Sequence, residues 1–216
     1  MKKLLIALLF VPLCAFASGG PELHLDRAPD RANDQAALQR GAKVFVNYCL
    51  NCHSASFFRY NKLKEIGLTE QQIIDNLMFT AEKIGEPMTT SLRRADAKAF
   101  FGAAPPDLTL VARARTGDYG SGSDWLYTYL RSFYQDPTRP TGWNNVVFPN
   151  VGMPHALWEL QGTQAMGPDH KLVLAAPGKM SQKEYDDMVG DLVAYMKFMA
   201  EPAAEFRKNL GVGLLL

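Results

Sequence analysis

The pentapeptide Cys49-Leu50-Asn51-Cys52-His53 constrains this chain more than any other feature of its sequence. A C-x-x-C-H pattern is typical of a covalent attachment site for c-type haem. Both thiols can form thioethers with vinyl groups of one porphyrin, and the adjacent imidazole then falls beneath the iron as its proximal ligand. The pattern therefore predicts a fold built around one haem c, held through Cys49 and Cys52 with His53 as a metal ligand. It also predicts electron transfer.

Two other uses of a C-x-x-C pair fit the rest of the sequence less well. A thioredoxin-like dithiol requires a βαβ context, whereas the residues before Cys49 have helical periodicity and those after His53 are typical of a loop. A zinc site requires about four ligands, and the third cysteine, Cys14, lies in a segment that we expect to be removed. Neither alternative gives the histidine after the second cysteine a role.

The N-terminal segment predicts an exported protein. Residues 1–17 have the three parts of a secretory signal peptide, namely Lys2-Lys3, an apolar run and a small-x-small cleavage site. We expect cleavage before Ser18, and a weaker alternative makes Cys14 a lipoprotein cysteine. Because c-type haem is attached after export in bacteria, the haem domain over residues 18–208 is expected in the periplasm.

The C-terminal segment 209–216 follows the cationic pair Arg207-Lys208 and is mostly apolar. A membrane-spanning helix needs about 20 apolar residues, so this segment alone is too short to cross a bilayer. Its last three leucines offer no polar face of the kind that ends a soluble chain. We therefore expect residues 209–216 to begin a transmembrane anchor, with a frayed terminus as the alternative.

The composition excludes one class of partner. The formal net charge of the 216-residue chain is +1, and 47% of its residues are hydrophobic, as in an ordinary globular domain. Loss of Lys2 and Lys3 with the signal peptide makes the mature chain close to neutral. We therefore expect no nucleic-acid partner.

Helical periodicity brackets the haem domain and predicts a mainly α fold. Near its end, Ser181 and Glu184 form a capping box, and the apolar spacing that follows runs to Met199 before Pro202 interrupts it. Before the C-x-x-C-H box, a single helical stripe contains the residues Ala37, Gly41, Val44, Phe45 and Tyr48, for which we expect core packing.

The region between these helices is harder to interpret. Thr69 is expected to cap a helix that buries Ile73, Ile74, Leu77 and Met78, and Ser123 one that buries Leu126, Leu130 and Phe133. Residues 83–180 are otherwise rich in turn formers and are expected to be mostly loop. Only residues 171–175 suggest a short strand. Such loops can bury their apolar side chains against a haem.

A haem that only carries electrons needs a protein ligand at its sixth position, usually Met or His. Met153 is the strongest candidate, because Gly152 lets the backbone approach a flat ring and Pro154 stiffens the loop. Core packing is expected for the methionines in apolar helical stripes, which are Met78, Met188, Met196 and Met199. The remaining alternatives for this ligand are Met88, Met166, Met180, His24, His155 and His170.

In four segments the chain resembles the cytochrome c1 family, the haem subunits of cytochrome bc1 complexes. These segments are residues 40–54 around the C-x-x-C-H box, 104–115 with Pro-Pro-Asp-Leu, 148–154 with Gly-Met-Pro, and 180–208 with Glu-Pro and Arg-Lys. The box alone indicates only a c-type cytochrome. The Pro-Pro-Asp-Leu and Glu-Pro segments are more specific.

The resemblance implies a cytochrome c-like fold with long loop insertions around one haem. It implies Met153 as the distal metal ligand opposite His53. Arg115 would pair with a haem propionate, and a carbonyl of the Pro105-Pro106 segment would accept the other imidazole N–H.

Two further positions bear on the resemblance. Trp125 falls where the family often places a large aromatic side chain near the haem, although core packing explains it equally well. His155 is a departure, because relatives often have another proline there, which would stiffen the distal loop.

The resemblance also implies a function. During ubiquinol oxidation, single electrons would pass from the Rieske iron–sulfur protein to this chain and then to a cytochrome c, with no bond chemistry on a substrate. The anchor would hold the chain beside cytochrome b in the bacterial inner membrane. The alternatives are a membrane-tethered cytochrome c subunit of a terminal oxidase and, from a different class, a haem enzyme with an open sixth site.

Overall fold

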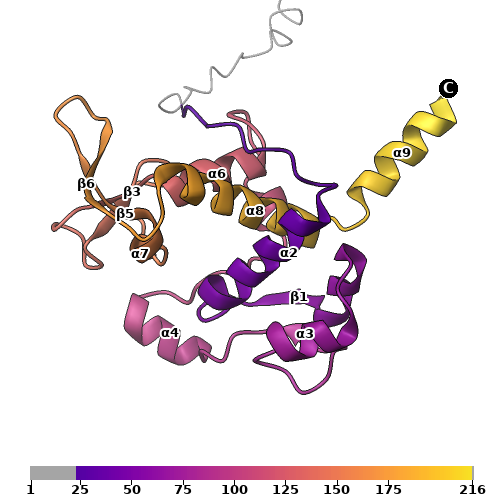
Figure 1. Cartoon of the computed structure of the whole chain (residues 1–216). Coiled ribbons are helices and arrows are strands. Elements are labelled where there is room, and N and C mark those ends of the chain that lie inside the picture. The colour runs from indigo at the N-terminus through magenta and orange to yellow at the C-terminus, as the bar shows by residue number, and fades with distance from the viewer. Residues whose placement is uncertain (1–22, 216) are drawn as a thin grey trace, which may run out of the picture.

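The computed structural model describes residues 23–215, so the expected signal peptide at residues 1–17 and Cys14 lie outside the described part. As predicted, the described part is mainly helical (Figure 1). Its α-helices are α2 (Gln35–Val44), α3 (Glu70–Asn76), α4 (Arg94–Phe101), α5 (Val111–Ala114), α6 (Gly122–Arg131), α7 (Trp158–Gln161), α8 (Gln182–Ala200) and α9 (Ala204–Leu215). A π-helical turn, η2 (Phe45–Cys49), and a 3-10 helix, η3 (Tyr60–Ile66), complete the helical elements.

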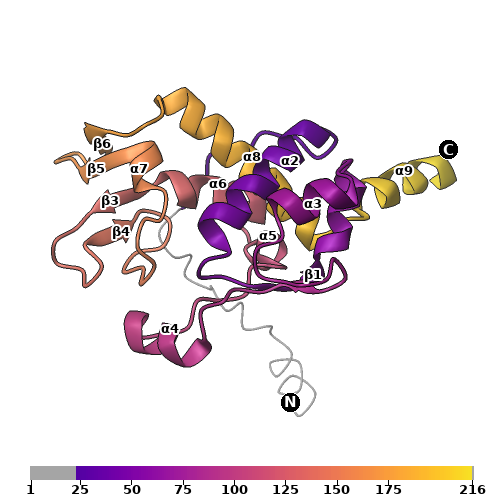
Figure 2. The ribbon, with the colours of Figure 1, turned by 60° about the horizontal axis from the view of Figure 1, so that its bottom comes forward.

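The centre of the fold is the contact between α2 and α8, which bracket the domain in sequence (Figures 1 and 2). The two helices pack closely at Gly41, where an added Cβ atom would lie 2.2 Å from the backbone oxygen of Asp191 and 2.7 Å from the Cβ of Tyr195. Only glycine allows two backbones to approach so closely. This contact fixes the direction of α2, whose chain continues through η2 into the C-x-x-C-H box.

Local capping signals define the helix starts. The capping boxes at Thr69 and Ser181 are both present, which confirms the starts of α3 and α8. The N-cap predicted for α6, Ser123, is wrong. The N-cap is Ser121, whose side chain accepts a hydrogen bond from the amide of Asp124. Ser121 has the extended backbone of an N-cap residue, whereas Ser123 lies in the first turn.

Two side chains expected in the core lie at the surface. Ile74 is 38% exposed, because α3 has only seven residues and buries one position, Ile73. Tyr48 is 37% exposed and lies in the π-helical turn after α2, whose periodicity differs from that of an α-helix, whereas Phe45 at the start of this turn stays buried.

The described part contains three antiparallel pairs of short strands, and five of these six strands lie in residues 83–180, the region expected to be mostly loop. The pair β5 (Gly162–Met166) and β6 (Leu172–Pro177) includes the strand expected at residues 171–175. The pairs β1 (Ala55–Arg59) with β2 (Pro87–Met88) and β3 (Phe133–Gln135) with β4 (Trp143–Asn145) were not predicted. With two to six residues each, these strands are too short for an alternating pattern to be distinctive.

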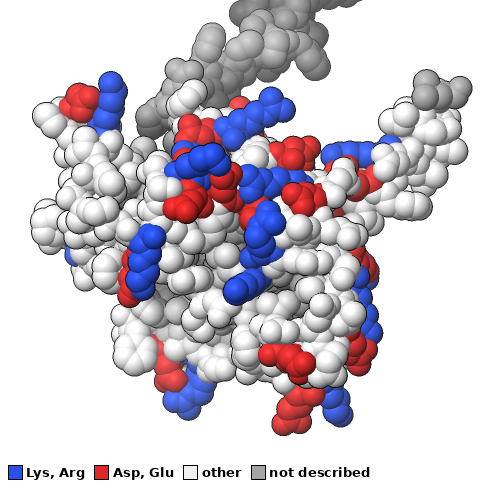
Figure 3. Space-filling model, in the orientation of Figure 1, with Lys and Arg blue, Asp and Glu red and all other residues white. Residues whose placement is uncertain are grey.

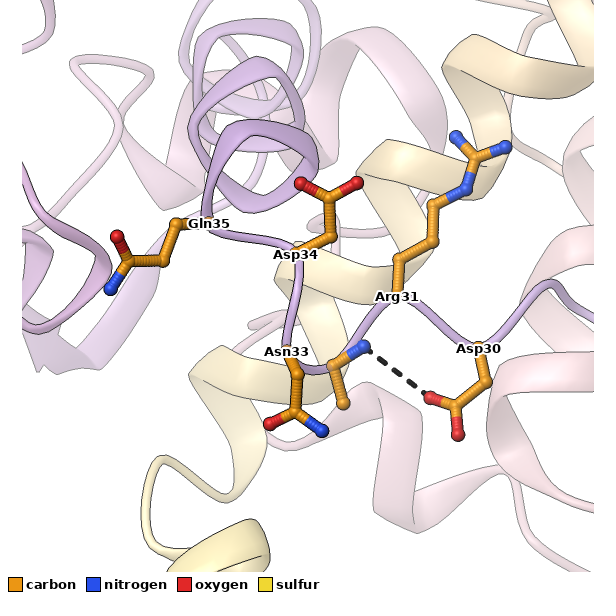
Figure 4. A pocket seen from close by; sticks show the side chains of 6 residues that line it. Asp30, Arg31, Asn33, Asp34 and Gln35 are labelled. Carbon is orange, nitrogen blue, oxygen red and sulfur yellow. Dashed lines mark hydrogen bonds between the residues drawn. The ribbon is translucent and has the colours of Figure 1, made fainter.

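An ionic network ties the segment before α2 to α8. Asp191 is 4% exposed and accepts hydrogen bonds from Arg31 and, at 2.6 Å, from the Nε of Arg40. Arg31 also bonds to Asp187 at 2.8 Å. Figure 4 shows Arg31 in the turn before α2, where residues 30–35 line a surface hollow. A buried carboxylate between two guanidinium groups has its charge compensated.

The hairpin of β5 and β6 and the helix α9 extend from opposite sides of the body (Figure 1). Helix α9 has 12 residues, none of them buried, and Leu214 and Leu215 are among its most exposed side chains. Within residues 23–215, no helix combines the length and apolar character required to cross a bilayer. On the face shown in Figure 3, cationic and anionic side chains are interspersed rather than segregated by sign.

Candidate haem site

The C-x-x-C-H box forms a tight turn at the end of η2. The amides of Cys52 and His53 both donate to the carbonyl of Cys49, at 3.1 and 2.8 Å. Both thiols are free and half-buried. Burial, with a smaller contribution from Cys52, raises the pKa of Cys49 to about 12, so this thiol is protonated at neutral pH and is a poor redox nucleophile.

The imidazole of His53 is fixed in one tautomer. Its Nδ1 lies 2.8 Å from the carbonyl oxygen of Pro106. Because a carbonyl can only accept, Nδ1 carries the proton and the lone pair of Nε2 is left for a metal. Burial lowers the pKa of His53, although the Pro106 hydrogen bond opposes this shift. The structure thus brings Pro106 to the position that the resemblance implies.

Asp107 holds the Pro106 loop against the chain that leaves the C-x-x-C-H box. Its carboxylate accepts from the amide of Ser56 at 2.7 Å and from the amide and hydroxyl of Thr109 at 2.9 and 2.6 Å. The amide of Leu108 donates to the carbonyl of Ser54 at 2.8 Å. Partial burial opposes ionisation of Asp107, but these hydrogen bonds lower its pKa below the ordinary value of 3.8.

Replacing Asp107 by alanine is expected to destabilise the fold by about 1 kcal/mol at neutral pH, because three hydrogen bonds at a partly exposed site are lost. A lowered pKa in the folded state contributes stability above pH 3.8 that is lost as the pH falls through the folded pKa. The difference between wild type and variant should therefore shrink in acid. Urea unfolding across pH 3 to 7 checks this, and Asp107→Asn, which keeps the acceptor for Thr109, should give an intermediate loss.

Met153 lies on a well-anchored loop. Before it, Asn150 adopts a positive φ of 64° and is held by hydrogen bonds from its amide to Asn144 and from Arg139 to its side chain. The sulfur of Met153 accepts from the hydroxyl of Tyr129 at 3.3 Å. Among the described residues, no atom lies within 4 Å of the position of a Cβ added at Gly152, so the backbone there is open on that side.

Arg115 lies in an aromatic cluster next to the Met153 loop. Its guanidinium lies 4.4 Å from the ring centroid of Trp125 and 5.3 Å from that of Phe148. Trp125 is buried and stacks on Tyr129, with 4.8 Å between their centroids. Between residues 23 and 215, no carboxylate lies within 4 Å of the Arg115 side-chain nitrogens. Arg115 therefore has its charge available for an anionic group.

These residues fit a c-type haem. They supply two thiols, an imidazole with a free Nε2, a thioether on an anchored loop and an arginine that has no carboxylate partner among residues 23–215. Cys49 and Met153 also pack against the same hydrophobic core. In the described part, no three metal-binding side chains of His, Cys, Asp or Glu gather into a site.

The other methionine and histidine candidates lie in different environments. Met88 is fully buried and accepts from the hydroxyl of Tyr195, and Met196 and Met199 are buried on α8. Met166 lies in β5. His24 and His170 are exposed.

Sequence reasoning missed two residues of the site. Tyr129 lies four positions after Trp125 on α6, so the helical spacing could have placed both on one face. His155 was considered only as a ligand and as a departure from the resemblance. The structure buries it, and its pKa is lowered to about 4, because burial outweighs a hydrogen bond to Gln161. It is therefore neutral at pH 7.

The fold and the site together define a haem protein that transfers electrons, of the cytochrome c type. The sequence pattern of the cytochrome c1 family matches residues 27–216. The chain belongs to the cytochrome c1 family, and it is therefore a haem electron-transfer subunit.

Individual relatives match all or most of the chain. It is 45% identical over 230 residues to cytochrome c1 of Allochromatium vinosum, covering 100% of this chain and 91% of that protein. It is 48% identical over 217 residues to a Nitrosomonas europaea protein described as the ammonia monooxygenase gamma subunit, covering 100% of this chain and 90% of the relative. Cytochrome c1 of Rhodospirillum rubrum is 31% identical over 211 residues, covering 85% of this chain and 75% of that protein.

Proposed function

We propose that this chain is the haem subunit of a bacterial cytochrome bc1 complex. It receives single electrons from the Rieske iron–sulfur protein during ubiquinol oxidation and passes them to a cytochrome c. The observation that carries the proposal is the match to the cytochrome c1 family over residues 27–216, which include both proposed iron ligands, His53 and Met153. When bound, the haem supplies a one-electron ferric/ferrous couple.

The chain's own residues hold the cofactor and exclude other chemistry. Cys49 and Cys52 bind it covalently, each by adding its S–H across one vinyl group. His53 offers Nε2 as the proximal ligand, since Pro106 holds Nδ1. Met153 would hold the iron through its thioether, which would leave no open position for a substrate and would give a higher potential than a second histidine. Arg115 pairs with a propionate, and the rings of Trp125 and Phe148 hold its guanidinium in place.

The two terminal segments support a proposed location in the cell. Residues 1–17 direct export, so the haem domain lies in the periplasm, where haem is attached. Residues 209–216 begin the anchor that holds the domain in the inner membrane beside cytochrome b. The exposed apolar side chains of α9, such as Leu214 and Leu215, support this part of the proposal, because they lack protein neighbours that would cover them.

The relative from Nitrosomonas europaea favours a second candidate, a haem subunit that serves an ammonia monooxygenase. Such a subunit would need the same thiols, His53 and Met153 to carry electrons, so the haem site does not separate the two functions. The two functions differ in the protein that accepts the electrons.

The test uses the full chain, tagged and purified from its source membranes in mild detergent. We expect an assembly with a Rieske iron–sulfur protein and cytochrome b that reduces cytochrome c when given quinol. We also expect haem to remain on the chain in a denaturing gel, and to be lost from the double variant Cys49→Ser and Cys52→Ser. Ammonia-dependent oxygen uptake without reduction of cytochrome c would favour the second candidate. Quinol-dependent reduction of oxygen would indicate a terminal oxidase.

A further inference from the structure

His155 lies two residues after Met153, at the position where the chain departs from the family resemblance. Its side chain is 2% exposed, and a buried imidazole N–H needs a hydrogen-bond acceptor. The Nε2 atom lies 2.7 Å from the Oε1 of Gln161. Because the amide of Gln161 donates to the carbonyl of Arg131 at 3.0 Å, its oxygen faces the imidazole. His155 Nε2 is therefore the donor.

Aromatic contacts fix the plane of the same ring. The imidazole stacks on Phe133, with 4.8 Å between centroids and an interplanar angle of 3°. The ring of Trp143 meets it edge-on, with the centroids 5.1 Å apart. A side chain held by a stack, an edge contact and a hydrogen bond has little rotational freedom.

The contacts of His155 lead back to the sulfur of Met153. Phe133 packs edge-on against Tyr129, with 5.0 Å between centroids. The hydroxyl of Tyr129 donates to the Sδ of Met153 at 3.3 Å. Met153 is thus connected to the His155–Phe133 stack by the short backbone through Pro154 and by the side chain of Tyr129. This closed set of contacts restrains the loop from both sides.

We propose that His155 and Gln161 are positioning residues for Met153. Their hydrogen bond holds the distal loop where the thioether can stay on the iron. A proline restricts φ locally, whereas the His155–Gln161 pair restricts the loop through a buried tertiary contact. The inference rests on the proposed role of Met153 as the distal ligand.

The test compares variants of the full-length protein with haem attached. Gln161→Met keeps a side chain of similar length but removes the acceptor for His155. We expect the weak far-red absorption of the sulfur-to-ferric-iron bond to decrease. The variant also loses the hydrogen bond from Gln161 to the carbonyl of Arg131. We expect carbon monoxide to bind the reduced protein about tenfold faster, because the loss of the buried His155–Gln161 hydrogen bond raises the fraction without Met153 by about that factor.

Gln164→Met is the matched control. The amide of Gln164 donates to the carbonyls of Arg131 and Phe133, both at 2.9 Å, so this variant loses two hydrogen bonds in the same region. Gln164 has no hydrogen bond to His155. We expect Gln164→Met to keep the far-red absorption and the slow carbon monoxide binding of the wild type, even where its stability is lower.

His155→Phe provides a second variant that keeps the aromatic stack and removes the N–H donor. It should reproduce the effect of Gln161→Met, and the double variant should be no more than slightly worse, because both changes remove one contact. The inference is overturned if both single variants bind carbon monoxide as slowly as the wild type, or if Gln164→Met changes as much as they do. A wild type without far-red absorption would instead overturn the assignment of Met153, and the positioning role with it.

Discussion

Replacing Met153 by leucine is expected to open the sixth position of the haem while leaving the fold intact. Leucine has nearly the volume of methionine and no sulfur donor, so a volume-conserving change of this kind costs less than about 1.5 kcal/mol. The far-red absorption of the oxidised protein should disappear, and carbon monoxide should bind the reduced protein readily. The reduction potential should fall by on the order of 100 mV, a fraction of the ~0.8 V range that axial ligands span.

Met88→Leu is the matched control for this change. Met88 is fully buried, and its sulfur also accepts from a tyrosine hydroxyl, that of Tyr195 at 3.4 Å. Both variants therefore remove a sulfur that accepts from a tyrosine hydroxyl, although Met88 is more deeply buried than Met153, and only Met153 is a proposed iron ligand. Absorption spectra and a redox titration of both proteins provide the measurement. Equal spectra for Met153→Leu and the wild type would exclude Met153 as the distal ligand.

The parts of the fold that could be predicted from the sequence depend on neighbours in the chain. The capping boxes at Thr69 and Ser181 use residues three positions apart, so they are visible in the sequence. The same is true of the C-x-x-C-H turn, whose hydrogen bonds join Cys49 to Cys52 and His53.

The parts that could not be predicted depend on contacts between distant segments. The strand β2 has two residues, and its pairing of Met88 with Ala55 gives no local pattern. The partners of His155 come from β3, β4 and α7, and each contact is set by how these elements pack. A proline at position 155 would have been an evident sign of rigidity, whereas a buried histidine becomes one only in three dimensions.

The candidate site divides in the same way. The roles of the two cysteine thiols, the His53 imidazole and the Met153 thioether could be predicted from the C-x-x-C-H motif and the family resemblance, because together these groups are typical of a haem site. The carbonyl of Pro106 was implied by resemblance, and the structure gives its distance to His53. Arg115 was expected near an anion, but its support by Trp125 and Phe148 arises from segments 10 to 33 residues away and was not predicted.

Replacing Gly41 by alanine is expected to destabilise the protein by about 2–3 kcal/mol, although helix propensity alone favours alanine by up to about 1 kcal/mol. The new Cβ would lie 2.2 Å from the backbone oxygen of Asp191, so α2 and α8 must move apart. Gly211→Ala is the control, because Gly211 also lies in a helix and, in the part of the chain that the structure describes, no atom lies within 4 Å of the position of an added Cβ. Urea unfolding should show a lower free energy of unfolding for Gly41→Ala and no decrease for Gly211→Ala.

Since α2 leads through η2 into the C-x-x-C-H box, the yield of covalent haem should fall for Gly41→Ala as well. Equal stability of the two variants would show that α2 and α8 do not meet closely at Gly41.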